Sequence, residues 1–197
     1  MSGIVVINNY VDYPKDDKIC QHTNPNTIMF LGKMDYEPNI TAVSYFVNTI
    51  FPQLRELYKN LKFIIVGAKP TKDVLNLQNY SGVEVTGFVD SIEPYFHDST
   101  IVIAPMLSGA GVQNKIIQAM SYGCCVATTT IGAEGISLKG NEIAIFNSDN
   151  EWLKGLSHLL SNKNLRLKMG KEARKTIVDT LSKERIYEQF KQLLKGL

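Results

Sequence analysis

The sequence predicts an α/β fold, with a Rossmann-like parallel sheet of about six strands, helices on both faces and additional C-terminal helices. Three observations predict it. Short apolar segments alternate along the chain with segments of helical periodicity. The apolar segments are almost continuously hydrophobic, as strands buried on both faces of a parallel sheet should be. Several of them end in a turn-forming residue, at the sheet edge where such folds bind ligands. These exit residues are Gly32, Gly67, Gly87 and Pro105.

Six segments have the composition of strands. Each is short, rich in β-branched or aromatic residues and bounded by turn-forming residues. In chain order they are Thr27–Gly32, Phe63–Gly67, Val83–Gly87, Ile101–Ala104, Cys124–Thr129 and Ile143–Phe146. We expect the last of them to be an edge strand. A further short strand is expected at Ile4–Ile7, without a partner visible in the sequence.

The intervening segments show helical spacing. Asn39–Tyr58 carries apolar residues three and four positions apart, and Pro52 is expected to kink this helix or to start a new turn. The other expected helices are Val74–Leu77, Ile92–His97, one that ends at Tyr122–Gly123, then Glu151–Leu160, Leu165–Asp179 and Ser182–Leu194. The last helix carries one apolar stripe, formed by Ile186, Phe190, Leu193 and Leu197.

The bulk composition excludes several classes of protein. With a net charge of +2 over 197 residues, the chain is not basic enough to predict a nucleic-acid partner. No apolar run approaches the roughly 20 residues that span a bilayer, and the N-terminus lacks the pattern of a signal peptide. The spacing of Cys20, Cys124 and Cys125 is not that of a disulfide or zinc framework. We therefore expect a cytoplasmic protein with small apolar thiols and no metal site.

The stretch Ser108–Gln118 is the most informative for function. A loop of small residues follows a strand and opens a helix, so that backbone N–H groups and the positive end of the helix dipole can bind an anion. Lys115 and Gln118 lie three residues apart and therefore share one helix face. A cation for a phosphate and an amide for hydroxyl groups together favour a nucleotide-linked ligand.

These segments together resemble the C-terminal half of a GT-B glycosyltransferase of the large retaining, family-4-like group, which includes sucrose synthases and many bacterial polysaccharide enzymes. The matching segments follow the family's order and cover most of the chain. They are VVINNYVD (5–12), FLGKMDYEPN (30–39), IIVG (64–67), VTGFVD (85–90), GAGVQNKIIQAMSYGCCVAT (109–128) and IGAEGI (131–136).

The resemblance implies a site for a nucleoside-diphosphate sugar of the UDP or GDP type, without a further cofactor. Lys33 and Lys115 would contact the diphosphate, and Gln118 the ribose. Phe88 and Val89 would frame the base. The loop from Ser108 to Val112 would lie against the donor sugar. The full implied set is Gly32, Lys33, Gly67, Phe88, Val89, Ser108, Gly109, Ala110, Gly111, Val112, Lys115, Gln118 and Glu134, and no catalytic residue is assigned.

The sequence departs from the family pattern at two places. The family usually has two glutamates eight positions apart, which here are Ala110 and Gln118, and Pro38 stands where many relatives have a second phosphate-binding lysine. Gln118 can still hydrogen-bond a ribose, whereas the Ala110 side chain cannot bind a sugar hydroxyl. Three functions stay open: the donor-binding half of a hexosyltransferase-type enzyme, a non-catalytic binding or assembly module, and a sugar-nucleotide epimerase domain.

The resemblance also implies a domain organisation. Residues 1–26 would be an interdomain linker and residues 27–197 the nucleotide-sugar-binding domain. The acceptor-binding N-terminal domain would be missing from this chain, so we expect the isolated domain to be inactive. The acceptor would be a glycan, a lipid or a similar molecule. For the full-length protein, the expectation extends to peripheral association with the inner face of the membrane.

Overall fold

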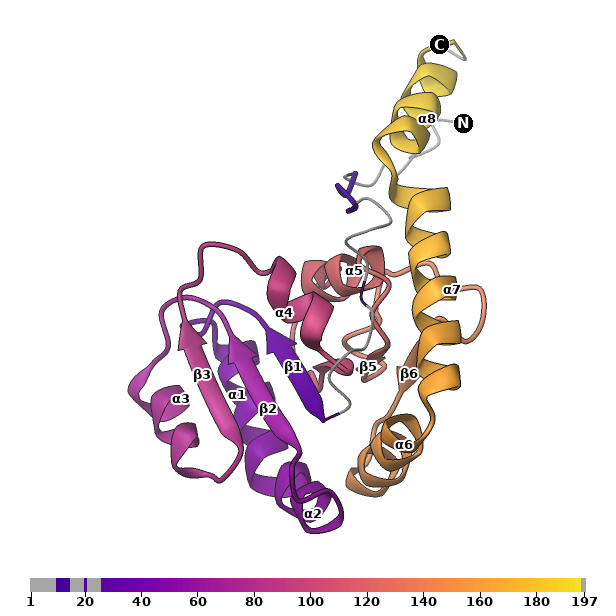
Figure 1. Cartoon of the computed structure of the whole chain (residues 1–197). Coiled ribbons are helices and arrows are strands. Elements are labelled where there is room, and N and C mark those ends of the chain that lie inside the picture. Colours follow the sequence, from indigo (N-terminus) through magenta and orange to yellow (C-terminus); the bar gives the residue numbers. More distant parts are fainter. Residues whose placement is uncertain (1–9, 15–19, 21–25, 196–197) are drawn as a thin grey trace.

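Six parallel strands form a single sheet in the computed structural model, which describes residues 10–14, 20 and 26–195. The strand order is β3-β2-β1-β4-β5-β6 (Figure 1). The strands are β1 (Thr27–Leu31), β2 (Lys62–Val66), β3 (Val83–Gly87), β4 (Ile101–Ala104), β5 (Val126–Thr128) and β6 (Ile143–Ile145). The predicted α/β class and the predicted edge position of the sixth strand are confirmed.

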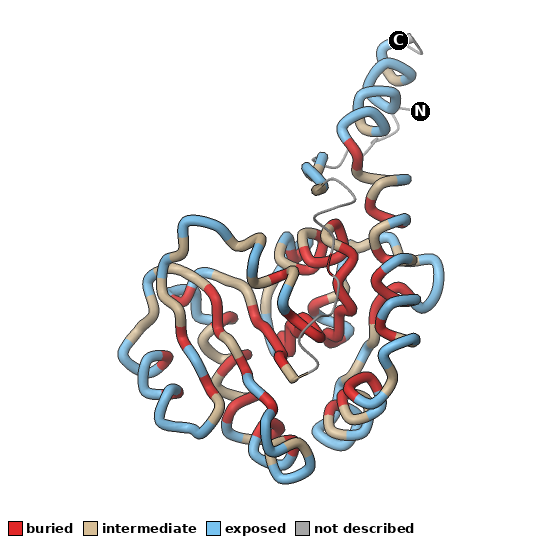
Figure 2. The backbone as a smooth tube through the Cα atoms, viewed as in Figure 1, coloured by how far each residue is buried: buried red, intermediate tan, exposed pale blue. Residues whose placement is uncertain are grey.

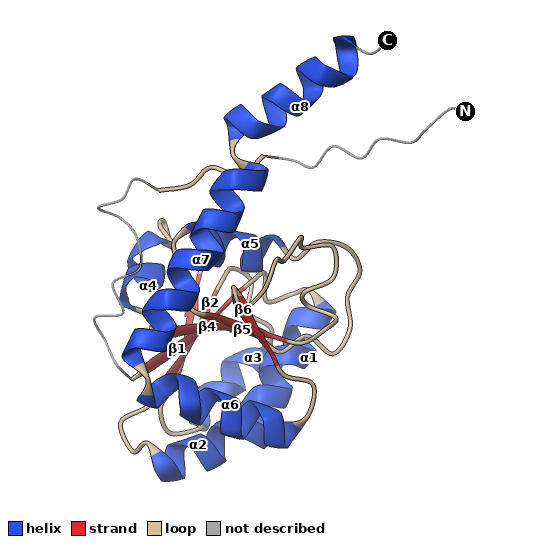
Figure 3. Cartoon of the chain, turned by 90° about the vertical axis from the view of Figure 1, so that its right-hand side faces the viewer, coloured by secondary structure: helices blue, strands red, loops and turns tan. Residues whose placement is uncertain are grey.

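Helices cover both faces of the sheet, as predicted. α4 (Glu93–Asp98) and α5 (Asn114–Ser121) lie on one face, whereas α1 (Glu37–Tyr45), α2 (Phe51–Leu57) and α6 (Asp149–Ser161) lie on the other (Figure 3). The buried residues follow the strands and the inward sides of these helices (Figure 2). The remaining helices are α3 (Lys72–Asn76), the 3-10 turn η3 (Leu77–Asn79), α7 (Lys163–Leu181) and α8 (Lys183–Lys195).

The long helix predicted for residues 39–58 is continuous but contains a π-helical turn, η2 (Phe46–Ile50), between α1 and α2. The Phe51 N–H donates to the Phe46 carbonyl, five residues back. Since Pro52 has no N–H to donate, the widened turn brings it to the first turn of α2, where no donor is needed. The turn also directs Phe46 against Phe63 of β2, with ring centroids 4.8 Å apart.

Strand β5 starts later than the sequence predicts. The expected strand began at Cys124, but the Cys124 N–H donates to the Ala119 carbonyl of α5, 3.0 Å away. The C-terminal end of α5 thus uses the donor that a strand would need. Pairing with β4 then begins at Val126, which lies opposite Val102.

Helix α8 projects away from the rest of the domain (Figures 1 and 3). Of its predicted apolar stripe, Ile186 and Leu193 are half-buried, Phe190 is 53% exposed and Leu197 lies outside the described residues. The described part of the stripe is therefore only partly covered. None of the described helices is both long and apolar enough to cross a membrane.

The described part of the predicted linker lies against α7. The Val11 N–H donates to the Leu181 carbonyl over 2.9 Å. The strand expected at Ile4–Ile7 lies outside the described residues, and the boundary between residues 1–26 and 27–197 stays a prediction.

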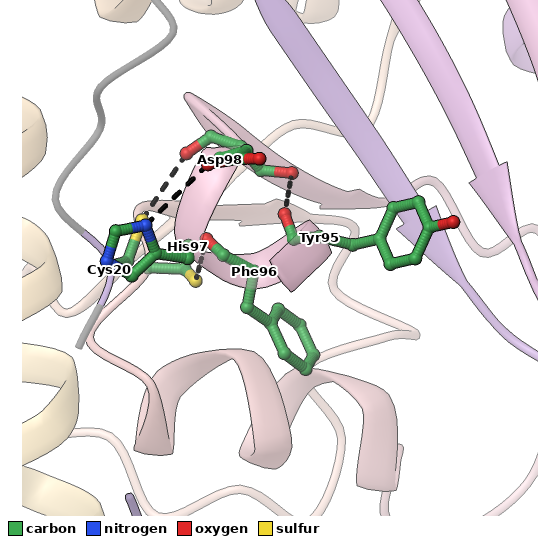
Figure 4. Close-up of polar contacts among 7 residues, drawn as sticks. Cys20, Tyr95, Phe96, His97 and Asp98 are labelled. Atoms are coloured by element: carbon green, nitrogen blue, oxygen red, sulfur yellow. Dashed lines mark hydrogen bonds and ion pairs between the residues drawn. The ribbon is translucent and has the colours of Figure 1, made fainter. Parts of the chain in front are cut away.

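The three cysteines, Cys20, Cys124 and Cys125, are buried thiols. Cys20 Sγ donates to the Ser99 carbonyl at 3.3 Å, and Cys124 Sγ to the Phe96 carbonyl at 3.6 Å (Figure 4). Burial raises the pKa of Cys124 well above its ordinary value and that of Cys125 to about 12. The latter two thiols therefore stay protonated near neutral pH. Among the residues that the structure describes, no three His, Cys, Asp or Glu side chains are grouped closely enough to hold a metal ion.

Candidate functional site

A hollow of about 540 Å³ opens at the carboxyl ends of the central strands. It lies where β1, β2 and β3 lead into loops and where the loop after β4 enters α5. Most of the residues predicted for the site line it together. They are Gly32, Lys33, Gly67, Phe88, Val89, Ala110, Val112, Lys115 and Gln118. The hollow therefore lies at the edge of the sheet where the residues that end the strands predict a ligand site.

Lys115, the second residue of α5, supplies a cation to this hollow. Its ammonium donates to Asn39 Oδ1 and contacts Met106 Sδ at 3.6 Å. It also lies 4.8 Å from the centroid of the Phe30 ring. All three partners are neutral, and no carboxylate of the described chain lies within ion-pair distance of it. Burial lowers the pKa of Lys115 to about 8. An anion in the hollow would supply the missing negative charge.

The start of α5 adds hydrogen-bond donors beside this cation. The Gln113 carbonyl accepts from the Ile116 N–H at 2.9 Å, which closes the first turn. In the described part of the chain, no protein group accepts a hydrogen bond from the backbone N–H of Asn114 or Lys115. These are the donors that a helix start leaves available to a phosphate.

The glycines at the ends of β1 and β2 are required by close packing as well as by the hollow. A Cβ on Gly67 would lie 1.7 Å from the Gly32 carbonyl oxygen. A Cβ on Gly32 would in turn lie 2.6 Å from Asn39 Nδ2. The absence of a side chain at Gly67 therefore allows the loops after β1 and β2 to approach, and its absence at Gly32 leaves room for the Asn39 amide.

Sequence reasoning missed Asn39. Its side chain is only 4% exposed, and its Nδ2 donates to the Lys33 carbonyl at 2.9 Å. A signal was present in the sequence, because Asn39 shares a helix face with the apolar residues Ala42 and Val43. A polar side chain on a buried face needs a hydrogen-bond partner, and this requirement makes Asn39 a candidate site residue.

The rim of the hollow carries Lys33 and Phe88. Lys33 is exposed and pairs with Asp35 at 3.4 Å, so its charge is partly matched already. Phe88 follows Gly87 at the end of β3 and is 75% exposed. An aromatic ring that is not needed by the core can stack on a planar ligand without any cost in packing. Val89, next to it, is half-buried and packs against the core.

Only some of the predicted residues in the loop before α5 line the hollow. Ala110 and Val112 line it, whereas Ser108, Gly109 and Gly111 do not belong to its lining. Gln113 holds the loop by donating from Nε2 to the Gly111 carbonyl at 3.3 Å.

Two of the predicted residues lie at the borders of the hollow or beyond it. Gln118 is half-buried and lines both this hollow and a neighbouring one of about 640 Å³, which Ser137 and Thr180 also line. Glu134 is exposed and lines neither of the two. The structure thus brings Gln118 to the site but does not bring Glu134 to it.

The comparison with protein families identifies the family of this chain. The model of the family described as "Glycosyl transferases group 1" matches residues 25–162. This range contains all six strands and every residue that lines the hollow.

A curated relative and two solved structures share the fold or part of the sequence. The relative is an uncharacterized 44.6 kDa protein in the cps region of Klebsiella pneumoniae, 26% identical over 144 residues, covering 68% of this chain and 37% of its own length. The first structure is TarM of S. aureus, solved with fondaparinux, α-GlcNAc-glycerol and UDP (TM-score 0.78, 17% identity, 98% of this chain and 40% of that chain). The second is the C-terminal domain of the group 1 glycosyl transferase LpcC from Francisella tularensis (TM-score 0.62, 17% identity, 85% of this chain and 90% of that chain). This chain therefore spans less than half of the first two proteins and most of the third.

Proposed function

The chain belongs to the group 1 glycosyl transferases, and we propose that it is the donor-binding domain of a hexosyltransferase that takes its sugar from a UDP- or GDP-linked donor. The acceptor would be a glycan, a lipid or a similar molecule bound by a further domain. The observation that carries this proposal is the Lys115 ammonium, half-buried at the start of α5 without a carboxylate partner among the described residues. A diphosphate is the ligand that such a cation and the adjacent N–H donors fit best.

Each part of the donor has a chemically suitable partner in this proposal. Lys115 and the first N–H groups of α5 would stabilise the negative charge that develops on the leaving diphosphate. Gln118 would bind the ribose hydroxyls through its amide, and Phe88 would stack on the base. Backbone N–H groups of the Ala110 loop would face the donor sugar. Lys33 would add a second, exposed cation at the rim.

The relatives support the chemical class of the donor and the pathway. TarM of S. aureus was solved with UDP, and the K. pneumoniae relative lies in a cps region. On the basis of these two observations we infer a role in polysaccharide biosynthesis. The expected cytoplasmic location and the membrane association of the full-length protein stay predictions.

Titration of the chain with UDP, GDP and ADP tests the proposal. We expect one of the first two to bind, and Lys115→Ala to weaken its binding about tenfold or more, since a hydrogen bond to a charged group contributes about 1.5–3 kcal/mol. Lys154→Ala is the matched control, because Lys154 is an exposed lysine on α6 outside the hollow. Absence of nucleotide binding by the wild-type chain would contradict the proposal, as would equal affinity in Lys115→Ala.

A non-catalytic binding or assembly module is the second candidate, and the pair Ala110 and Gln118 favours it. Neither side chain carries the negative charge that the family's glutamates have at these positions. Sugar transfer by a full-length protein that contains this chain would exclude this function. An epimerase would alter a nucleotide sugar without any acceptor, and product analysis with the donor alone distinguishes it from a transferase.

A further inference from the structure

We propose that Asn39 is a positioning residue for the donor diphosphate: its amide oxygen holds the Lys115 ammonium at the hollow without neutralising the charge. The inference rests on the proposed function and deepens it. Asn39 comes from α1, the helix that follows β1, whereas Lys115 lies 76 residues later on α5. One hydrogen bond thus joins the first turns of the two helices that border the hollow.

The orientation of the Asn39 amide is fixed on its other side. Its Nδ2 donates to the Lys33 carbonyl at 2.9 Å, so the oxygen and not the nitrogen must face Lys115. The side chain is 4% exposed, which leaves solvent no role in its orientation. A Cβ on Gly32 would approach Nδ2 to 2.6 Å, so the space around the amide is filled.

The ammonium is held from other directions by groups that carry no charge. Met106 Sδ lies 3.6 Å from Lys115 Nζ, and the Phe30 ring centroid lies 4.8 Å from it. Together with the Asn39 oxygen, these groups restrict the position of Nζ. Pre-organisation of this kind lowers the entropic cost of binding a charged ligand.

The choice of an amide over a carboxylate is the central chemical point. An aspartate at position 39 would form an ion pair with Lys115 and offset the positive charge that a diphosphate needs. An amide oxygen accepts the same hydrogen bond and leaves a full unit of charge for the ligand. Asn39 therefore acts on the donor through Lys115.

A double-mutant cycle of Asn39→Ala and Lys115→Met tests this coupling. The probes are the nucleoside diphosphate that the wild-type chain binds, UDP or GDP, and the corresponding nucleoside. We expect Asn39→Ala to weaken diphosphate binding about fivefold to tenfold in the wild-type background and to have no effect in Lys115→Met. Nucleoside binding should stay unchanged in both backgrounds, whereas a merely structural role would weaken it as well.

Asn39→Asp provides a second variant with nearly unchanged side-chain volume. We expect it to weaken diphosphate binding more than Asn39→Ala does, because the new carboxylate would pair with Lys115. Thermal unfolding of each variant identifies any that does not fold, and the other variant then carries the test.

The outcomes separate the two proposals. If the wild-type chain binds no nucleotide, the proposed function is wrong. If the diphosphate binds and Lys115→Met weakens it, while Asn39→Ala has no effect or has an equal effect in both backgrounds, only the role of Asn39 is overturned.

Discussion

The ammonium of Lys115 lies 4.8 Å from the centre of the Phe30 ring, so that a cation from α5 rests against an aromatic residue of β1. A ring face attracts a cation by about 0.5–2 kcal/mol without carrying a charge of its own. The contact therefore stabilises the position of the ammonium and leaves its charge available.

Binding of a nucleoside diphosphate should depend on pH through Lys115. Burial lowers the pKa of Lys115 to about 8 in the free domain, and a bound diphosphate would raise it. Since the free-state pKa is the lower of the two, affinity should be full below pH 8 and should fall as the pH rises through that value. Calorimetry at pH 8.5 in buffers of different ionisation enthalpy should detect proton uptake on binding.

Lys115→Met is the control for this pH dependence, because it removes the titrating group. Its affinity should be lower and flat between pH 7 and 9, a window that brackets the pKa of about 8. An equally steep decrease in the variant would assign the titration to another group.

Phe88 should contribute to base binding and not to stability. Its side chain is 75% exposed, so Phe88→Ala should change the free energy of unfolding by less than about 0.5 kcal/mol. Loss of stacking should weaken the nucleoside and the nucleoside diphosphate alike, by about 1–3 kcal/mol. The matched control is Leu57→Ala, on the 63% exposed Leu57 of α2. Unchanged nucleoside affinity in Phe88→Ala would remove Phe88 from the site.

The end of β2 should not tolerate a side chain. A Cβ on Gly67 would lie 1.7 Å from the Gly32 carbonyl oxygen, which is backbone and cannot move away alone. We expect Gly67→Ala to lower the free energy of unfolding by about 3 kcal/mol or more, measured by urea denaturation. Gly87→Ala is the control, since Gly87 has φ +69° with nothing within 4 Å of an added Cβ. It should cost only about 1 kcal/mol of conformational strain, and an equal loss in both variants would argue against the packing explanation.

The fold was predictable because strands of a parallel sheet are buried on both faces and therefore carry unbroken apolar runs. The late start of β5 was not predictable, since it depends on the Cys124 N–H being bonded to α5. The π turn at Phe46 was not predictable either. Pro52 indicated a disturbance in the helix, but its local pattern does not specify a π turn, and the contact of Phe46 with Phe63 joins residues of different elements.

The candidate site was predictable where its residues are close in sequence. The loop before α5, Lys115 and Gln118 could be interpreted from one short stretch, because helix geometry fixes their relative positions. The contact between Asn39 and Lys115 spans 76 residues, and no local spacing encodes it. Glu134 was predicted by resemblance alone, and the turn after β5 leaves it exposed outside the hollow.

The carboxylate of Glu142 should make the free energy of unfolding of the domain depend on pH in the acid range. Burial alone would raise the pKa of Glu142, but hydrogen bonds from the Lys139 and Gly140 N–H groups and from the Thr176 hydroxyl lower it below the ordinary 4.5. The folded-state pKa is the depressed one, so this stabilisation is present above about pH 4.5 and is lost as the pH falls through the folded-state value. Glu142→Gln should therefore lower the free energy of unfolding by about 1–3 kcal/mol at pH 7, and by less at pH 4, in urea titrations at the two pH values. Glu56→Gln, on the exposed side of α2, should leave the difference between the two pH values as in the wild-type chain. If the stability of Glu142→Gln were as sensitive to acid as that of the wild type, this carboxylate would not be a stabilising link between the loop before β6 and α7.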